Sequence, residues 1–264
     1  HRVDRRQRQM CIRDSPDIIL IWGCMHLYNS TLKEINGRGI TTVSYNNDNP
    51  FGVRDRSLRY ILGRNIWSNF RKNLPLYDYN FVYRQSNMED YRRLGLTNVH
   101  MLPSYYIPGR NFLLNSPKSD DYDGVFIGHY EKDERAEVII HLRRHNIRVE
   151  VYGTDWDRES VYPGEFDNLV PLMDKAYNEK INGAKFALCF FSTINADDYT
   201  RRVFEITAAG TLLVAPRTAM MKSLFVDGEE AIFFETADEA SVRLAALLLD
   251  ENEMARIAAN GHRR

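Results

Sequence analysis

The feature that most constrains the fold is a regular alternation of short apolar runs with amphipathic helical segments. Apolar runs lie at residues 17–22, 40–45, 78–84, 98–103, 124–128, 148–153, 186–191, 211–216 and 231–234. Parallel strands need a crossover connection, which is usually a helix, so this order predicts parallel sheets covered by helices. The chain has 264 residues, of which 44% are hydrophobic, which is sufficient for two such domains.

The first apolar run, DIILIW at residues 17–22, shows how the strands are recognised. It lies between Pro16 and Gly23, and no polar residue follows Asp17 within it. A continuous apolar run of this length is typical of a strand that is buried on both faces. We therefore expect this segment to be a strand with neither face exposed.

A segment rich in Pro, Gly, Ser and Asp, at residues 108–123, separates two groups of these elements. We predict an α/β fold with two Rossmann-like doubly wound parallel-sheet domains, at residues 15–115 and 116–264. Residues 1–14 contain five arginines and have no periodicity, so we interpret them as a non-native tail. The first domain is then expected to lack its beginning.

The two halves of the chain differ in charge. Residues 1–115 carry 17 Lys and Arg against 9 Asp and Glu, whereas residues 116–264 carry 18 against 27. This contrast indicates two lobes with different surfaces. The basic residues are scattered and are not grouped with stacking aromatic residues, so we expect no nucleic-acid partner.

Other signals exclude further classes of protein. No segment reaches the ~18 consecutive apolar residues of a membrane span, and no secretory signal is evident. The three cysteines are sparse, odd in number and without metal-binding spacing, which favours a reducing compartment. We therefore expect a cytoplasmic protein with no membrane span.

Ligands of open parallel sheets bind beyond the carboxyl ends of the strands, close to helix N-termini. The first such junction in the second domain is Gly128-His129, and Arg135 lies in the first turn of the next helix. Gly128 would let a ligand approach the backbone closely. A plain tight turn is the alternative interpretation. The second junction contains Tyr152 and Gly153, an aromatic ring and a glycine that could hold a flat base.

The third junction, DDYTRRVFEITAAG at residues 197–210, carries the most charge. Arg201 and Arg202 follow Thr200 in the first turn of a helix, where acidic residues are usually preferred. A bound diphosphate explains two guanidinium groups there, since its oxygens accept paired hydrogen bonds from arginine. The alternative is that Asp197 or its neighbour only caps the helix and pairs with the arginines.

Glu205 is not explained by that alternative, because it lies between Phe204 and Ile206 in an apolar helical run. If its carboxylate faces a crevice, it is well placed to accept hydrogen bonds from ribose hydroxyls.

Taken together, these segments resemble GT-B glycosyltransferases, specifically the CgeB-like, spore-maturation type. The similar segments are TRRVFEITAAGTLLVAP, GVFIGHYEKDERAEVIIHL, VEVYGTDW, YNEKINGAKFALCFF and residues 225–261, in that family's order. DIILIWGCMH and SYNNDNPFG in the first half are also similar. The resemblance covers residues ~17–261.

The resemblance implies two domains facing a cleft, with a nucleotide-sugar donor on the second and an unknown glycan, protein or small-molecule acceptor on the first. The implied donor-binding residues are Gly128, His129, Arg135, Tyr152, Gly153, Trp156, Thr200, Arg201, Arg202 and Glu205. Glu205 would bind the ribose, Arg201 and Arg202 the diphosphate, and Tyr152 with Gly153 the base. Helix ends and basic side chains stabilise the leaving diphosphate in such enzymes, so we expect no metal and no cofactor.

Three residues are the catalytic candidates. Asp197 occupies the first position of the Glu-x7-Glu pattern of retaining GT-B enzymes, where a shorter acid could still contact the sugar. His26 follows the first strand and could take a proton from the acceptor hydroxyl. Asp48 is the second candidate for this base. The alternatives are a loop histidine without a role and a turn-forming aspartate.

The predicted function is therefore metal-independent transfer of a sugar, of hexosyltransferase type, from a nucleotide-diphosphate donor to an acceptor hydroxyl, in a bacterial cytoplasmic protein that is incomplete at both ends. One alternative is a nucleotide- or sugar-binding or assembly protein of the same fold without turnover. Another is a metal-dependent transferase that uses Asp-Trp-Asp at residues 155–157, a motif of the other major glycosyltransferase fold. The sugar, the base and the acceptor stay open.

Overall fold

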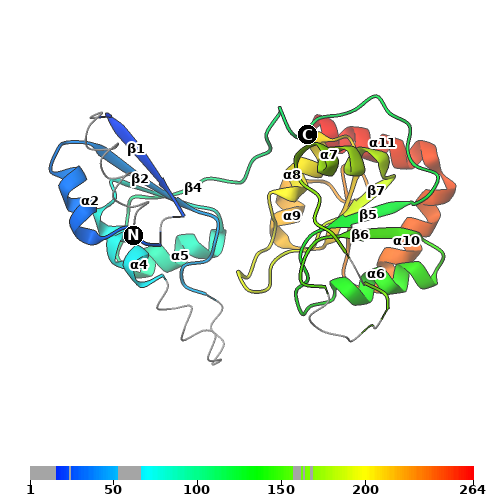
Figure 1. The fold of residues 1–264 in the computed structure, drawn as a ribbon, viewed down its shortest axis with the longest axis horizontal. Coiled ribbons are helices and arrows are strands. Elements are labelled where there is room, and N and C mark those ends of the chain that lie inside the picture. Colours follow the sequence, from blue (N-terminus) through cyan, green and yellow to red (C-terminus); the bar gives the residue numbers. More distant parts are fainter. Residues whose placement is uncertain (1–15, 24, 53–66, 157–161, 163, 167–168) are drawn as a thin grey trace. The chain divides into compact units, whose positions relative to one another are not determined.

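The computed structural model describes residues 16–23, 25–52, 67–156, 162, 164–166 and 169–264. The chain divides into two compact units (Figure 1). The N-terminal unit comprises the residues up to Pro103 together with Ile194–Ala196, and the C-terminal unit comprises Ser104–Thr193 and Asp197–Arg264.

The N-terminal unit contains a parallel sheet in the order β1-β2-β3-β4. Its elements are β1 (Ile18–Trp22), α2 (Asn29–Asn36), β2 (Thr41–Asn46), α4 (Ser68–Asn73), the 3₁₀ helix η1 (Leu74–Leu76), β3 (Tyr79–Val82), α5 (Gln85–Arg93) and β4 (Val99–Met101). Leu32, Phe70 and Leu74 are fully buried in its core. The four strands predicted for this half are confirmed.

Strand β1 corrects one expectation. It pairs only with β2 among the described strands, and its side chains alternate between the core and solvent. Ile21 is buried, whereas Ile18, Leu20 and Trp22 are 63%, 57% and 47% exposed. The expectation that neither face of residues 17–22 is exposed is wrong, because an edge strand with period-two alternation leaves one apolar face uncovered here.

The C-terminal unit contains five parallel strands in the order β6-β5-β7-β8-β9. Its elements are β5 (Gly124–Ile127), α6 (Arg135–Arg144), β6 (Val149–Tyr152), α7 (Asp174–Gly183), β7 (Phe186–Leu188), α8 (Arg202–Ala208), β8 (Leu212–Pro216), α9 (Ala219–Leu224), β9 (Ile232–Phe234), α10 (Ala237–Leu249) and α11 (Glu251–Arg263). Figure 1 shows the sheet between α6 with α10 on one face and α7, α8 with α11 on the other. The predicted α/β class with two parallel sheets is confirmed.

The core of the C-terminal unit explains why the strands read as continuous apolar runs. Phe126, Phe186 and Val214 lie on different strands and are each at most 2% exposed. Helices cover both faces of this sheet, so both sets of side chains along a strand are buried. Ile139 and Leu244 complete the cluster from α6 and α10.

The chain between the two sheets lies against α7. Asn178 and Asn182, one turn apart on that helix, are buried and hydrogen-bond the backbone of the preceding segment. Asn178 Oδ1 accepts from Phe112 N–H at 3.2 Å, and Asn182 Oδ1 accepts from Leu114 N–H at 2.7 Å. Residues 104–115, which we expected at the end of the first domain, therefore group with the C-terminal unit.

A close backbone approach joins β5 to β6 at their carboxyl ends. Gly153 has φ +150°, and a Cβ atom there would lie 1.8 Å from the carbonyl oxygen of Gly128. That φ belongs to a region that only glycine adopts readily. The strand end can therefore form only with glycine at position 153.

We predict that Gly153→Ala destabilises the C-terminal unit by roughly 3 kcal/mol or more, because it combines a backbone clash with a strained φ. Gly228→Ala is the matched control. Gly228 also has a positive φ, +80°, but its nearest contact to an added Cβ would be 3.7 Å. We expect it to cost only about 1 kcal/mol. Thermal or urea unfolding measures both, and equal losses would contradict the close approach.

Candidate functional site

The strand order of the C-terminal unit identifies one edge as the candidate site. β5 comes first in the chain but lies between β6 and β7: the chain passes from β5 to β6 on one side and then crosses over to β7 on the other. Such a switch point opens a crevice at the carboxyl ends of the two central strands. The residues that follow β5 and β7 are therefore the ones to examine.

Arg202, at the start of α8, reaches this edge. Its Nη1 group donates a hydrogen bond to the carbonyl oxygen of Ile127, the last residue of β5. Gly128 leaves the space that the guanidinium uses, since a Cβ atom at Gly128 would lie 2.7 Å from Arg202 Nη1. The same Cβ would lie 2.6 Å from the ring of Phe126. The structure thus brings Gly128 and Arg202 together.

Glu205 lies one turn after Arg201 on the same side of α8. Its carboxylate Oε1 is 2.7 Å from Arg201 Nε. The Glu205 side chain is 8% exposed, whereas the Arg201 side chain is 45% exposed. The carboxylate of Glu205 is therefore buried, and the partly exposed guanidinium of Arg201 pairs with it. Thr200 and Asp197 precede them in the loop after β7, where Asp197 N–H donates to Ser192 O at 2.8 Å.

The electrostatics at the end of β7 show that these charges converge. Cys189 directly follows that strand and is buried. Burial raises the pKa of its thiol to about 12, the positive charges of Arg202 and Arg135 oppose the rise, and the negative charge of Glu205 adds to it. The thiol is therefore neutral, and three charged side chains act on the same point.

Arg135 is buried and its contacts are made within the protein. Its Nε and Nη2 groups donate to both oxygens of Asp133 at 2.7 and 2.6 Å. Its Nη1 group donates to His129 O at 2.6 Å, and Nη2 also lies 3.3 Å from Phe191 O. Most of the donors of this guanidinium are used, so Arg135 joins the loop after β5 to the end of β7.

His129 and Glu131 form a second set of contacts in the loop after β5. His129 Nε2 lies 2.9 Å from Glu131 Oε1. The Glu131 side chain is 3% exposed, and the His129 side chain is 53% exposed. Burial alone would raise the pKa of Glu131, but hydrogen bonds from His129 and Ser192, the charge of Arg135 and a hydrogen bond from Thr193 lower it to about 2. Glu131 is therefore ionised at neutral pH.

The donor-binding residues expected after β6 make contacts inside the unit. Trp156 is buried and donates from Nε1 to Gly128 O at 2.9 Å. Its ring packs on Phe126 and Phe166. The Tyr152 hydroxyl donates to Glu150 Oε2 at 2.8 Å, on the side of the sheet where Lys180 lies. Trp156 and Gly153 thus shape the strand end from within.

The two candidates for the catalytic base lie in the N-terminal unit. His26 is exposed in a turn between β1 and α2, and Asp48 is exposed in a bend after β2. Asp48 N–H donates to Asn46 Oδ1 at 3.3 Å. Both residues therefore follow the carboxyl ends of strands, as the sequence indicated.

The acidic motif Asp-Trp-Asp is described only in part. Asp157 lies outside the described residues, and Asp155 occupies a turn with φ +70°. In the similar Asp-Tyr-Asp at 121–123, Asp123 is bonded to Arg148 and Lys185. No group of three or more His, Cys, Asp or Glu that could hold a metal ion occurs within the ranges that the structure describes.

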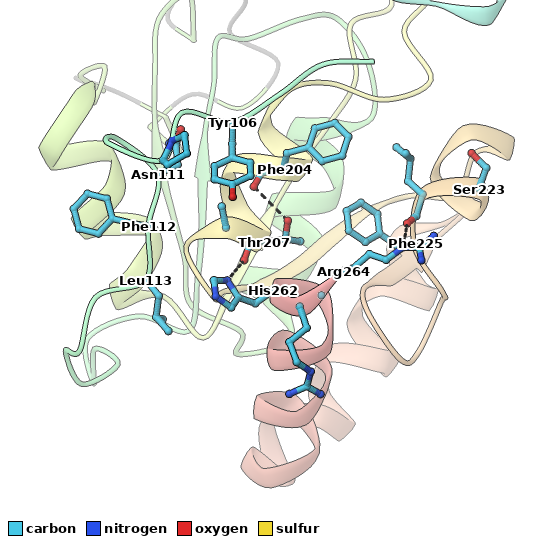
Figure 2. A pocket seen from close by; sticks show the side chains of 15 residues that line it. Tyr106, Asn111, Phe112, Leu113, Phe204, Thr207, Ser223, Phe225, His262 and Arg264 are labelled. Atoms are coloured by element: carbon cyan, nitrogen blue, oxygen red, sulfur yellow. Dashed lines mark hydrogen bonds between the residues drawn. The ribbon is translucent and has the colours of Figure 1, made fainter. Parts of the chain in front are cut away.

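A separate pocket of about 740 Å³ lies on the other side of α8 (Figure 2). Phe204, Phe225 and Tyr106 line it, and His262 Nδ1 lies 3.0 Å from Thr207 O at its wall. None of the predicted site residues lines this pocket. Helix α8 thus presents Phe204 to this pocket, whereas Glu205 on the same helix does not line it.

Sequence reasoning missed Glu131, Asp133 and Thr193. The available signal was local: Glu131 and Asp133 lie four and two residues before Arg135, a spacing that favours pairing where a helix begins. Thr193 gave no signal, because its contact with Glu131 joins loops that follow different strands.

None of the helices within the described ranges is long and apolar enough to cross a bilayer.

Comparison with known proteins adds two findings. Residues 134–264 match the model of a family described as glycosyl transferase-like. No curated protein matches the chain in sequence.

Several solved structures share the fold. Sucrose-phosphate synthase of Thermosynechococcus elongatus is 11% identical with a TM-score of 0.65, over 97% of this chain and 70% of that one. HepE of Anabaena, solved with UDP-glucose, is 12% identical with a TM-score of 0.63, over 98% and 76%. TarM is 11% identical with a TM-score of 0.64, and the match covers 93% of this chain and 50% of the TarM chain. These likenesses show the fold, two Rossmann-like domains of the GT-B class.

The depressed pKa of Glu131 predicts a pH effect on stability. The unfolded carboxyl titrates near 4.5 and the folded one near 2, so the unfolded state binds more protons between these values. The stabilisation is complete above about pH 5 and is lost as the pH falls towards 2, by about 3 kcal/mol.

Glu131→Gln removes this titration while keeping the shape of the side chain. The unfolding free energy of the wild type should therefore fall more steeply than that of the variant between pH 5 and pH 2, as measured by urea denaturation across about this range. Parallel curves would show that these contacts do not lower the pKa of Glu131.

Proposed function

We propose that this chain is a glycosyltransferase that moves a sugar from a nucleotide-diphosphate donor, held by the C-terminal unit, to an acceptor hydroxyl. The observation that carries the proposal is the placement of Arg202 beside Gly128 at the carboxyl end of β5, with the buried carboxylate of Glu205 three residues further along the same helix. Parallel sheets bind ligands at this edge. The glycosyl transferase-like match of residues 134–264 and the UDP-glucose complex of HepE support it.

In this proposal Arg202 and Arg201 meet the diphosphate. Arg202 uses Nη1 to hold Ile127 O, which fixes the guanidinium beside Gly128 and leaves further N–H donors for phosphate oxygens. Arg201 is joined to Glu205 through Nε, and its guanidinium carbon lies 5.9 Å from the centroid of the Tyr105 ring. A guanidinium fixed before the ligand arrives needs little reorganisation as charge develops on the leaving group.

Glu205 binds the donor ribose. Its carboxylate is buried, and an ion pair with Arg201 keeps the carboxylate in place. Carboxylate oxygens accept from the two ribose hydroxyls, a pairing that a neutral side chain reproduces poorly. The proposed site also includes further residues beside the strand ends: His129, Tyr152, Gly153, Trp156 and Thr200. Trp156 and Arg135 contribute by holding the backbone at Gly128 and His129.

The reaction exchanges one bond at the sugar's anomeric carbon for another. The bond to the donor's β-phosphate oxygen breaks and its electrons remain on the nucleoside diphosphate. A new bond forms to the acceptor oxygen, whose proton passes to a base. We propose His26 or Asp48 for that base and Asp197 for contact with the sugar. No metal is required where fixed cations accept the developing charge.

The finer assignments rest on the ordered series of motifs. We propose the CgeB-like type, hexosyl transfer and a bacterial cytoplasmic protein, with an acceptor that is a glycan, a protein or a small molecule. The cysteines are few and odd in number, which favours a reducing compartment.

The central test is nucleotide binding by titration calorimetry with UDP, GDP and ADP. Among these nucleotides, the one that binds the wild type should bind Glu205→Gln with an affinity lower by about 10- to 100-fold. This is the loss expected for charge-assisted hydrogen bonds. Asp155→Asn is the matched control, since asparagine also tolerates the left-handed backbone at Asp155, and it should change affinity by less than about twofold. Equal losses, or a loss only for Asp155→Asn, would place the donor elsewhere.

Metal independence is tested by transfer itself. Release of free nucleoside diphosphate from nucleotide sugars, with extracts that supply acceptors, should continue at an unchanged rate in excess chelator, since arginines carry the charge of the leaving group. Loss of release that Mn²⁺ restores would favour the metal-dependent alternative. Binding without any release would favour a non-catalytic protein.

A further inference from the structure

Glu131 is a buried carboxylate for which donor binding as described above gives no direct role. Its Oε2 oxygen accepts hydrogen bonds from Thr193 N–H at 2.9 Å and from Thr193 Oγ1 at 3.0 Å. Its Oε1 oxygen lies 2.9 Å from His129 Nε2 and 3.8 Å from Arg135 Nη2. The carboxylate thus joins the loops after β5 and β7 and, at the same time, contacts an exposed imidazole.

The geometry fixes which nitrogen of His129 can meet a ligand. An ionised carboxylate only accepts hydrogen bonds, so the hydrogen of this contact must be on Nε2. Nδ1 is then the nitrogen that faces the surroundings of the 53% exposed ring. The main chain of His129 is held as well, because Arg135 Nη1 donates to its carbonyl oxygen. Ring and backbone are therefore fixed by separate partners.

The position of His129 indicates the ligand group. It directly follows Gly128, where the Arg202 guanidinium lies at the end of β5. Arg135 is occupied by both oxygens of Asp133, so its charge is compensated by that carboxylate. An imidazolium between Glu131 and a phosphate anion donates one hydrogen bond to each, from Nε2 and from Nδ1.

We propose that Glu131 is a positioning residue that aims Nδ1 of His129 at the diphosphate of the donor. The inference rests on the proposed function, since it assumes a nucleotide-diphosphate ligand at this edge. Glu131 acts only through His129 and the loop, and His129 makes the contact. The arrangement resembles the carboxylate that orients a ligand-bearing histidine in many sites, where the acid selects the nitrogen that is presented.

A double-mutant cycle tests this coupling, with affinity for the nucleoside diphosphate that binds in the calorimetric panel as the readout. His129→Ala should weaken binding about tenfold and Glu131→Gln several-fold. In the His129→Ala background, Glu131→Gln should have almost no further effect, because its route to the ligand is gone. An equal loss in both backgrounds would mean that Glu131 only supports the loop, and would overturn the proposal.

Two conservative variants identify the nitrogen. The amide of asparagine can occupy the place of Nδ1, so His129→Asn should keep more affinity than His129→Gln, whose amide lies near the place of Nε2. His145→Ala, at an exposed histidine after α6, is the control and should bind like the wild type. The reverse order of the two amides would overturn the assignment of Nδ1.

Failure of the inference and of the proposed function can be separated. If the wild type binds no nucleoside diphosphate, both are overturned. If the wild type binds one and His129→Ala binds it equally well, the proposed function stands and this inference is wrong. Thermal unfolding of each variant shows whether it remains folded; loss of the hydrogen bond from His129 to the buried Glu131 should lower the unfolding temperature of His129→Ala by only a few degrees.

Discussion

The carboxyl end of β5 is the point on which the rest of the C-terminal unit depends. Two consecutive carbonyl groups there are held by side chains from other elements: Arg202 donates to Ile127 O and Trp156 to Gly128 O. Gly153 makes this possible, because any side chain at that position would collide with the Gly128 carbonyl. A strand end fixed in this way has few remaining conformations, so whatever binds beside it meets a preformed surface.

The charges around this point are arranged in pairs before any ligand arrives. Asp133 compensates Arg135, Glu205 compensates Arg201, and Glu131 contacts His129. Buried charges without such partners are costly, and breaking one pair leaves the other charge exposed to a low-dielectric interior. Arg202 differs from the other arginines because the contact that fixes it is a neutral carbonyl. Its charge is therefore the least compensated of this group, which is the property that an anionic ligand requires.

The sequence was most informative where a pattern is local. Strand and helix order follow from the spacing of apolar residues, and eight of the nine described strands lie within predicted runs, while β2 extends one residue beyond its run, to Asn46. The junctions after β5 and β7 were recognisable from Gly128 and from the charged segment at 197–210. In contrast, the exposure of one face of β1 depends on which strands flank it, and pairing partners are not encoded in the run itself.

The contacts that the sequence could not reveal join segments distant in the chain. Asn178 and Asn182 hydrogen-bond backbone groups that lie 66 and 68 positions earlier in the chain. Polar residues on a helix more commonly indicate its solvent-facing side, so this contact could not be predicted. Thr193 meets Glu131 across 62 positions. Trp156 was expected to hold a ligand, yet aromatic residues at strand ends also serve to seal a core, and the packing of Phe126 and Phe166 against Trp156 is a contact between segments distant in the chain or held apart by a loop.

The charge at the start of α8 has two explanations that hold at the same time. Arg201 pairs with Glu205 along the helix, which is the structural reason for placing a basic residue one turn before an acid. Arg202, its immediate neighbour, points to the sheet and ends at Ile127 O. Successive helical residues are rotated by about a hundred degrees, so the two adjacent side chains leave the helix in different directions. The local pair therefore holds the carboxylate that a pentose would need, while the second arginine carries positive charge to the strand end where a phosphate group would lie.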